Sequence, residues 1–290
     1  MNEASVRKGE WLEIPIELTA ASSMEEWMVN QVGIPPKLLI KLKQEQGIRQ
    51  KSDRMLLHLF PQEFDDYQAH WMDIEVLYED DFCLVVNKPA GLKVHPAHAE
   101  DEPTLGNAVA AHYLHTGQTC KVRHIHRLDE HTSGAVLYAK NELAQLLLDQ
   151  QMRSKWIQRQ YIAFVQGIVK SSKGRIDDPI GRDRHHPSRR RVSATGDTAV
   201  THYERIETFQ LATLLRLRLE TGRTHQIRVH LSHFHHPILG DTLYGGNIIW
   251  IGRQALHGEI LQFMHPFFQR LIEIEAPWPI DLLELHRKLQ

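Results

Sequence analysis

The segment 126–134, HRLDEHTSG, gathers chemically active side chains around one carboxylate. Asp129 has His126, Arg127 and His131 close to it in sequence, and two hydroxyl residues and a glycine follow. Hydroxyls can hold a carboxylate in place, and glycine lets a second backbone or a ligand come close. A carboxylate placed in this way can act as a nucleophile on a sugar or base carbon. The residues alone also fit a capped turn with a surface salt bridge.

The segment 222–231, GRTHQIRVHL, offers a guanidinium that could partner this carboxylate. Gly222 ends the preceding strand pattern, and we expect Thr224 to cap a helix through its hydroxyl. Arg228 lies one helical turn beyond Thr224, over the same face. A guanidinium beside a buried carboxylate favours the ionised form of that carboxylate. Taken alone, the pattern favours a helix whose arginines face water.

A tyrosine stands on the alternating segment 159–167, RQYIAFVQG. In a strand, Tyr161 faces the same side as Ala163 and Val165. A tyrosine in this position either stacks on a nucleic-acid base or fills a core. The pattern by itself favours the core.

A basic strip lies at residues 182–191, RDRHHPSRRR, in a chain whose net charge is only −2. A local strip of this kind can bind phosphates while the whole molecule stays nearly neutral. A solvated loop is the alternative. The candidate phosphate contacts are its five arginines, Arg182, Arg184, Arg189, Arg190 and Arg191.

The 20 histidines invite a metal-hydrolase interpretation, since His124 and His126 precede Asp129 and His131. The spacing differs from the HxHxDH pattern of such enzymes, and we expect no metal. The chain also lacks GxxxxGK[ST], GxGxxG and GxSxG, which argues against nucleoside-triphosphate, dinucleotide and α/β-hydrolase sites. The two isolated cysteines form no disulfide framework and favour a reducing compartment.

The elements that must position these residues are short strands and helices without a regular βαβ rhythm, which predicts an α+β fold. We expect paired strands at 76–78 and 82–87, strands at 134–140 and 161–165, and an antiparallel pair at 198–206 and 211–219. Two short helices separated at Pro35-Pro36 come before a linker at 61–70. The linker divides the chain into residues 1–70 and 71–290. No apolar run is long enough for a membrane span, and no secretory signal is evident.

Together these motifs resemble the RluA-type pseudouridine synthases, in order, from about residue 76 to residue 277. HRLDEHTSG fits the family pattern HRLD-x-x-TSG without a break. VVNKPAGLKVHP (85–96), GRTHQIRVHL and GDTLYG (240–245) also match. RQYIAFVQG carries Arg159 where lysine is usual, and LHGEIL (256–261) has a glycine in place of the alanine of Leu-His-Ala.

The resemblance implies that the protein converts uridine to pseudouridine in a structured ribosomal or transfer RNA, without a cofactor. It makes Asp129 the essential aspartate, Arg228 its partner and Tyr161 the residue that packs on the target base. It implies that Arg127 and Thr132 shape the loop and touch RNA. Attack by Asp129 on C6 of the base or C1′ of the sugar, or abstraction of a proton from C2′, all stay open. The rival interpretations are a non-catalytic RNA-binding scaffold and a metal-dependent hydrolase.

The resemblance also implies a largely antiparallel catalytic domain preceded by an alpha-L RNA-binding module of the ribosomal-protein type. Residues 22–54 resemble the helix pair of that module, but GIRQ at 47–50 replaces its closing Val-Asn-Gly turn. Acidic residues outnumber basic ones in this part of the chain, although 37–54 is locally basic. We therefore expect residues 1–70 to form a degenerate version of the module. RNA is the expected partner, with no membrane or obligatory protein partner, and the expected location is the cytoplasm.

Overall fold

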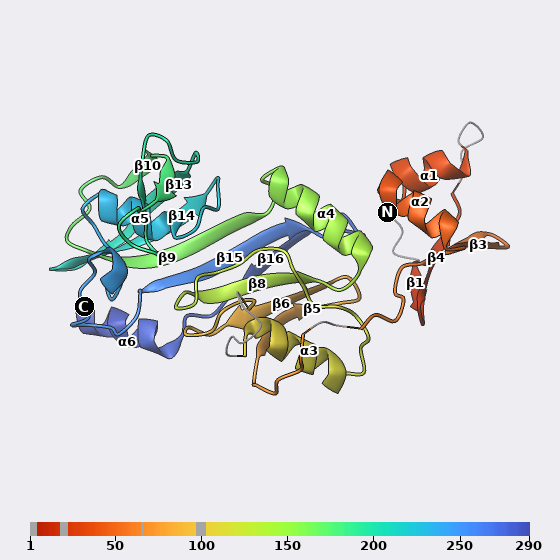
Figure 1. Ribbon diagram of the computed structural model, residues 1–290, viewed down its shortest axis with the longest axis horizontal. Helices are drawn as coiled ribbons and strands as arrows, with labels where there is room; N and C mark the ends of the chain where they lie inside the picture. The colour runs from red at the N-terminus through yellow and green to blue at the C-terminus, as the bar shows by residue number, and fades with distance from the viewer. Residues whose placement is uncertain (1–4, 18–22, 65–66, 97–102) are drawn as a thin grey trace.

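The chain folds into a small N-terminal unit and one long sheet (Figure 1). The computed structural model describes residues 5–17, 23–64, 67–96 and 103–290. Within the predicted linker 61–70, residues 65–66 lie outside the described residues and the others form no helix or strand. Every helix among the described residues is too short or too polar to span a lipid bilayer.

The N-terminal unit is an antiparallel sheet, in the order β1-β2-β4-β3, with two helices. Ser23 accepts a hydrogen bond from the amide of Glu26 and the Glu26 side chain accepts from the amide of Ser23, a capping box that starts the first helix. Pro36 opens the second helix, where a missing amide costs no hydrogen bond. The predicted helix pair is present. The elements are β1 (Val6–Lys8), β2 (Trp11–Pro15), α1 (Met24–Asn30), α2 (Pro36–Gln44), β3 (Ile48–Lys51) and β4 (Arg54–His58).

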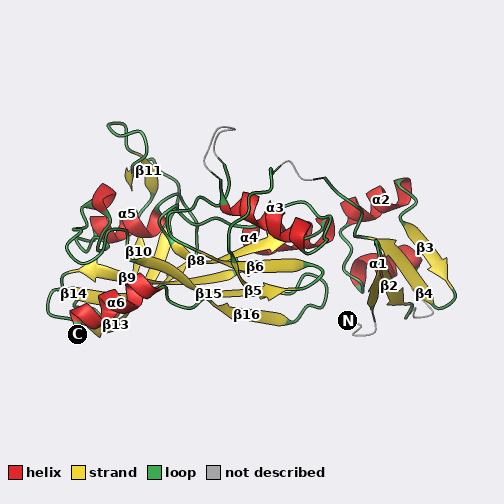
Figure 2. Cartoon of the chain, turned by 90° about the horizontal axis from the view of Figure 1, so that it is seen from below, coloured by secondary structure: helices red, strands yellow, loops and turns green. Residues whose placement is uncertain are grey.

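The rest of the chain builds a ten-stranded sheet whose main path runs β10-β13-β14-β9-β15-β8-β6-β5 (Figure 2). Strand β16 pairs with β15, β7 pairs with β8, and β11 and β12 form a separate hairpin. The elements are β5 (Glu75–Glu79), β6 (Cys83–Lys88), α3 (Leu105–His115), β7 (Arg123–His124), β8 (Ser133–Ala139), α4 (Glu142–Arg153), β9 (Gln158–Gln166), β10 (Lys173–Asp177), β11 (Ile180–Arg182), β12 (Arg190–Val192), β13 (Val200–Thr208), β14 (Ala212–Leu219), α5 (Gln226–His233), the 3-10 helix η1 (Thr242–Tyr244), β15 (Leu256–Met264), β16 (Leu271–Glu275) and α6 (Ile280–Leu289).

All ladders of this sheet are antiparallel except the one between β8 and β15. The predicted α+β class with a mixed, largely antiparallel sheet is confirmed. Each predicted strand and strand pair is present, with ends shifted by at most three residues.

The two faces of the sheet are buried under different helices. Residues that alternate along β6 and β8 belong to different cores, as the two-residue period of a strand requires. Leu84 and Val136 pack with residues of α3 in one core. Val85 and Leu137 pack with residues of α4 in the other. Because helices cover both faces of this part of the sheet, a site can form only at the ends of its strands. Strands β8 and β15 begin side by side at one such end.

The close approach predicted for Gly134 occurs between β8 and β15. Gly134 has a φ of +126°, and a Cβ atom there would lie 2.3 Å from the carbonyl oxygen of Gly258. Only glycine allows this contact without moving a strand. The parallel pairing of Gly134 with Gly258 therefore fixes where β8 begins, directly after the loop that carries Asp129.

The start of α5 differs from the prediction. Thr224 does not cap the helix: the residue before α5 is His225, in a left-handed conformation with φ +57°. The side chain of Gln226 instead accepts a hydrogen bond from the amide of Arg223 at 3.0 Å. The threonine prediction was wrong because it assumed that the chain enters this helix in an extended conformation.

Candidate active site

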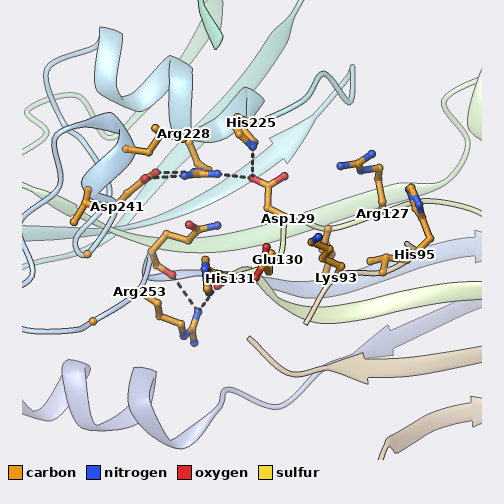
Figure 3. A pocket seen from close by; sticks show the side chains of 17 residues that line it. Lys93, His95, Arg127, Asp129, Glu130, His131, His225, Arg228, Asp241 and Arg253 are labelled. Atoms are coloured by element: carbon orange, nitrogen blue, oxygen red, sulfur yellow. Dashed lines mark hydrogen bonds and ion pairs between the residues drawn. The ribbon is translucent and has the colours of Figure 1, made fainter. Parts of the chain in front are cut away.

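Asp129 lies in the loop between β7 and β8 and lines a cavity of about 470 Å³ (Figure 3). A smaller hollow of about 90 Å³ lies beside it, and Asp129, Arg127 and Arg228 line both. The larger volume is in the range of small-molecule sites. The side chain of Asp129 is 20% exposed, so its carboxylate is accessible from the cavity.

Arg228 joins Asp129 to a second, buried aspartate. One guanidinium nitrogen of Arg228 donates to Oδ2 of Asp129 at 3.1 Å. The Nε and the other terminal nitrogen donate to the two carboxylate oxygens of Asp241 at 2.7 and 2.9 Å. Burial alone would lower the pKa of Arg228, but the hydrogen bonds and charge of Asp241, with those of Asp129, raise it. The guanidinium is therefore held in a fixed plane by Asp241 and presents its other terminal nitrogen to Asp129.

His225 approaches the same oxygen of Asp129. Its Nε2 atom lies 4.0 Å from Oδ2 of Asp129, and its Nδ1 atom lies 2.9 Å from the hydroxyl of Tyr244. Burial lowers the pKa of His225, an effect that the charge of Asp129 opposes. Both protein neighbours of the carboxylate thus lie at Oδ2. Within the described residues, Oδ1 of Asp129 accepts no protein hydrogen bond and is free for a substrate.

Tyr161 lines the smaller hollow next to Asp129. The residue is 5% exposed, and burial raises the pKa of its hydroxyl. The ring thus belongs to the core, as its strand pattern indicated, while part of it borders the site.

The loop that carries Asp129 is fastened on both sides. Lys88 is fully buried, and its Nζ donates to the carbonyl oxygens of Pro89, Leu92 and Glu130 at 2.7–2.8 Å. Thr132 is 2% exposed and accepts a hydrogen bond from Gln254 at 3.0 Å. This burial supports the loop-shaping part of the prediction for Thr132, and it argues against the RNA contact.

The opposite wall of the cavity is basic. Lys93, His95 and Arg127 lie on the side of Asp129 away from Asp241 (Figure 3). Arg127 is exposed, as an RNA contact must be. His95 stacks on His124, with ring centroids 4.9 Å apart. Among the described residues, the histidines of the 124–131 segment do not gather as metal ligands.

The five arginines of the basic strip lie on the hairpin of β11 and β12 and its loop, which we call the arginine hairpin (residues 180–192; Figure 2). Arg182 and Arg190 face each other in register, and Arg189 pairs with Asp183 at 3.0 Å. Arg182, Arg184 and Arg191 are exposed and have no ion-pair partner among the residues that the structure describes. The amide of Arg190 donates to the Tyr244 hydroxyl at 2.9 Å, so the hairpin touches the site network.

Several site residues were not predicted from the sequence: Lys88, His225, Asp241 and Tyr244. Each stands inside a motif that the sequence analysis singled out, NKPAG, GRTHQIR or GDTLYG. The only sequence signal for Asp241 was its place inside the GDTLYG motif. Only the fold shows that its partner is Arg228.

Comparison with known proteins identifies the family. Residues 82–233 match the family model for RNA pseudouridylate synthase. The chain is 42% identical over 288 residues to an uncharacterized RNA pseudouridine synthase, YhcT, of Bacillus subtilis, covering 96% of this chain and 93% of the relative. It is 40% identical to the ribosomal large subunit pseudouridine synthase D of Xylella fastidiosa, covering 79% and 73% of the two chains.

A solved structure supports the fold. The human RNA pseudouridylate synthase domain containing 4 superimposes with a TM-score of 0.62 at 22% identity, over 74% of this chain and 92% of that one. At this identity the likeness concerns the fold alone. The family model and the close relatives carry the assignment further: the chain belongs to the RNA pseudouridylate synthase family and isomerises uridine to pseudouridine in RNA.

Proposed function

We propose that Asp129 is the catalytic carboxylate, that Arg228 orients it, and that Tyr161 packs against the target base. The observation that carries the proposal is the asymmetry of the Asp129 carboxylate. Its Oδ2 faces Arg228 and His225, whereas Oδ1 has no protein hydrogen bond within the described residues and borders a cavity. A carboxylate held by one oxygen keeps the other available for chemistry.

The reaction breaks the bond between C1′ and N1, turns the base and joins C1′ to C5, with loss of the hydrogen at C5. The electron pair of the broken bond stays with the uracil ring. Electrons at C5 of the turned ring then form the new bond to C1′, the hydrogen of C5 leaves as a proton, and N1 gains a proton. No redox change is involved. Attack on C1′ or C6, or removal of a proton from C2′, would each use the free oxygen of Asp129.

The target uridine must leave its stack before Asp129 can reach it, at a cost of a few kcal/mol. Packing of the base against the part of Tyr161 that lines the smaller hollow would offset part of this cost. The ribose and its phosphates would then lie in the larger cavity, beside Lys93 and Arg127. The exposed Arg182, Arg184 and Arg191, with Arg189 and Arg190, would bind flanking phosphates, so binding should weaken steeply with salt.

We propose ribosomal RNA of the large subunit as the substrate and the cytoplasm as the location. The support is the relatives named ribosomal large subunit pseudouridine synthase D. Transfer RNA is the alternative. Residues 1–70 would assist as an RNA-binding module through the exposed Lys37 and Lys51. Lys41 and Lys43 are paired with Glu142 and Glu25, so this contribution should be modest.

Tritium release from RNA labelled at uracil C5 tests the proposal. Wild type should release tritium from large-subunit RNA, and Asp129→Asn should not, although it still binds the RNA. Release of tritium from transfer RNA alone would mean that transfer RNA, and not ribosomal RNA, is the substrate. Release by the purified Asp129→Asn variant would reject Asp129 as the catalytic group.

A further inference from the structure

A short chain of polar contacts runs from the arginine hairpin to the Asp129 carboxylate. The amide of Arg190 donates to the hydroxyl of Tyr244 at 2.9 Å, and that hydroxyl lies 2.9 Å from Nδ1 of His225. The Nε2 atom of His225 lies 4.0 Å from Oδ2 of Asp129. Residues from four separate parts of the sequence thus form a link between a proposed RNA-binding hairpin and the proposed catalytic group.

The donors and acceptors along this chain have one consistent direction. The Tyr244 hydroxyl accepts from the Arg190 amide, so its own proton is available for Nδ1 of His225. A neutral His225 then carries its proton on Nε2, the nitrogen nearest to Asp129. The charged groups around the imidazole are Asp129, Asp241, Arg228 and Arg190, and burial favours its neutral form.

Packing makes the link firm at its hairpin end. Tyr244 is 8% exposed and belongs to a small core with Ile180, Val229 and the partly buried Val192. Ile180 and Val192 are the paired residues at the base of the hairpin. The guanidinium of Arg228 lies over the Tyr244 ring, 4.9 Å from its centroid. A displacement of the hairpin base must therefore move Tyr244, and with it the hydroxyl that holds His225.

The last contact of the chain, between His225 and Asp129, is too long to be a hydrogen bond. A nitrogen–oxygen distance of 4.0 Å is about 1 Å longer than a hydrogen bond. The loop that carries Asp129 is fixed by Lys88 and Arg228, so the imidazole is the partner that can approach. A hydrogen bond from Nε2 of His225 would give Oδ2 of Asp129 a second donor and would turn the free Oδ1 towards the substrate.

We propose that His225 and Tyr244 are positioning residues that couple the binding of RNA phosphates by the arginine hairpin to the orientation of Asp129. The inference rests on the proposed function. It adds that the hairpin contributes to the rate of the chemical step as well as to binding. A uridine bound without contacts to the hairpin would then be isomerised slowly, which provides a means of selecting the RNA.

The first test is Tyr244→Phe, which keeps the ring in its core and removes only the hydroxyl. We expect single-turnover tritium release with saturating enzyme to slow about tenfold, the value of one hydrogen bond, while the half-saturating enzyme concentration changes less than twofold. His225→Asn should have the same effect, because asparagine tolerates the left-handed backbone but cannot reach Asp129. Tyr138→Phe is the matched control, since that hydroxyl is buried without a hydrogen-bond partner among the described residues.

The decisive test is a double-mutant cycle with the hairpin. Arg182→Gln combined with Arg191→Gln should slow the saturated rate about threefold in the wild-type background and leave it unchanged in the Tyr244→Phe background. Effects that multiply, or a Tyr244→Phe rate within twofold of wild type, would overturn the coupling. If wild type releases tritium and Asp129→Asn does not, such a result rejects the coupling alone and leaves the proposed function intact.

Discussion

Two aspartates lie beyond the two opposite ends of strand β8, and each lies near a histidine. At the end near the N-terminal unit, Asp80 lies 2.7 Å from Nε2 of His265. Its other hydrogen bonds come from the hydroxyl of Tyr78 and from the amides of Phe82 and Cys83, at 2.5–2.8 Å. Asp129 at the other end has one close partner, Arg228, and one distant one, His225. The first carboxylate is saturated by the protein, and the second is left with a free oxygen.

The saturated carboxylate belongs to the structure. Burial alone would raise the pKa of Asp80, but the hydrogen bonds from His265, Tyr78 and the Phe82 amide outweigh it and lower the pKa to about 2. The ligand atoms of Asp80, Cys83 and His265 lie within 4.8 Å of one another, as in a metal site. Burial raises the pKa of the Cys83 thiol, so it stays protonated, and four donors already occupy the carboxylate. The hydrogen bonds that hold the turn at Asp80 therefore account for the grouping of Asp80, Cys83 and His265.

The location of Asp80 agrees with this structural role. Next to it, Phe82 stacks on Phe267 at 5.1 Å and meets Phe60 of the N-terminal unit edge-on at 5.5 Å. Arg7 pairs with Asp81 across the same junction. The aspartate therefore fixes the turn against which the N-terminal unit packs. A carboxylate near a histidine therefore indicates chemistry only when the protein leaves one of its oxygens without a donor.

The largest effect should come from Asp129→Asn. We expect tritium release to fall roughly 10²–10⁴-fold, because the free oxygen loses its charge. The free energy of unfolding should change by less than about 0.5 kcal/mol, since Arg228 keeps both bonds to Asp241. Urea unfolding checks the second part. A large loss of stability would mean that Asp129 resembles Asp80 more than the comparison allows.

Arg228→Ala should damage both activity and stability. Its removal leaves Asp241, whose side chain is 1% exposed, as a buried charge without its partner. We expect a destabilisation of about 3–5 kcal/mol and a loss of most activity. Combining Arg228→Ala with Asp241→Asn should recover part of the stability and none of the activity. Recovery of both would show that Arg228 serves only to neutralise Asp241.

Asp80→Asn should reverse the pattern of Asp129→Asn. The amide oxygen can keep part of the turn, but the charged hydrogen bonds with His265 and Tyr78 are weakened. We expect a loss of about 1–3 kcal/mol in the free energy of unfolding and tritium release within twofold of wild type. A strong loss of tritium release in a folded Asp80→Asn protein would contradict the purely structural role of Asp80.

A second histidine near Asp129, His126, makes the stability of the protein sensitive to pH. His126, next to the catalytic loop, is buried and its Nδ1 has no hydrogen-bond partner among the described residues. Burial, helped by the charges of Arg159 and His124, lowers the pKa of His126 to about 3. An unfolded histidine, with a pKa of about 6.5, binds a proton between these values that the folded one does not, so stability falls as the pH falls through this window.

His126→Gln should remove that part of the acid sensitivity. Between pH 6.5 and pH 5.0, wild type should lose about 2 kcal/mol more stability than the variant. Glutamine keeps an acceptor for the Leu137 amide, which now donates to Nε2 of His126 at 3.3 Å. Urea unfolding of both proteins at the two pH values measures the difference. Equal losses would mean that His126 is not the buried neutral histidine described here.

The sequence predicted the strands that are marked by apolar runs, by apolar alternation or by a turn between two such segments. β6, β8, β9 and the β13 and β14 pair were all identified in this way. It did not predict β10 or the arginine hairpin, since short strands with charged residues carry no apolar period. The C-terminal helix α6 was also missed. The place of β10 depends on pairing with β13, more than twenty residues away in the sequence.

The site shows the same limit. Residues 129 and 228 are 99 positions apart, and no periodicity brings them together. Only the ordered motifs of the family linked them. The roles of the buried Asp241 and of the contacts through His225 and Tyr244 could be recognised only in the folded structure. Each of these residues bonds a partner that is distant in the sequence.

The smallest effect concerns Gly258, which stands opposite Tyr161 in the ladder of β15 and β9. A Cβ atom there would lie 3.5 Å from Cε1 of Tyr161 and 3.7 Å from Cδ2 of Leu128, which is ordinary contact. Gly258→Ala should therefore raise the free energy of unfolding by about 0.5–1 kcal/mol, by restricting the unfolded chain. Tritium release should stay within twofold of wild type.

The matched control for this prediction is Gly134→Ala on the neighbouring strand. A Cβ atom at Gly134 would lie 2.3 Å from the backbone of Gly258, at a φ of +126°, so this variant should lose roughly 3 kcal/mol. Thermal unfolding of the two variants separates the cases. If Gly258→Ala destabilised the protein as well, the space behind Tyr161 would be tighter than the geometry indicates. The base-packing surface beside Asp129 would then tolerate no added methyl group, whereas the turn at Asp80 lies too far away to be affected.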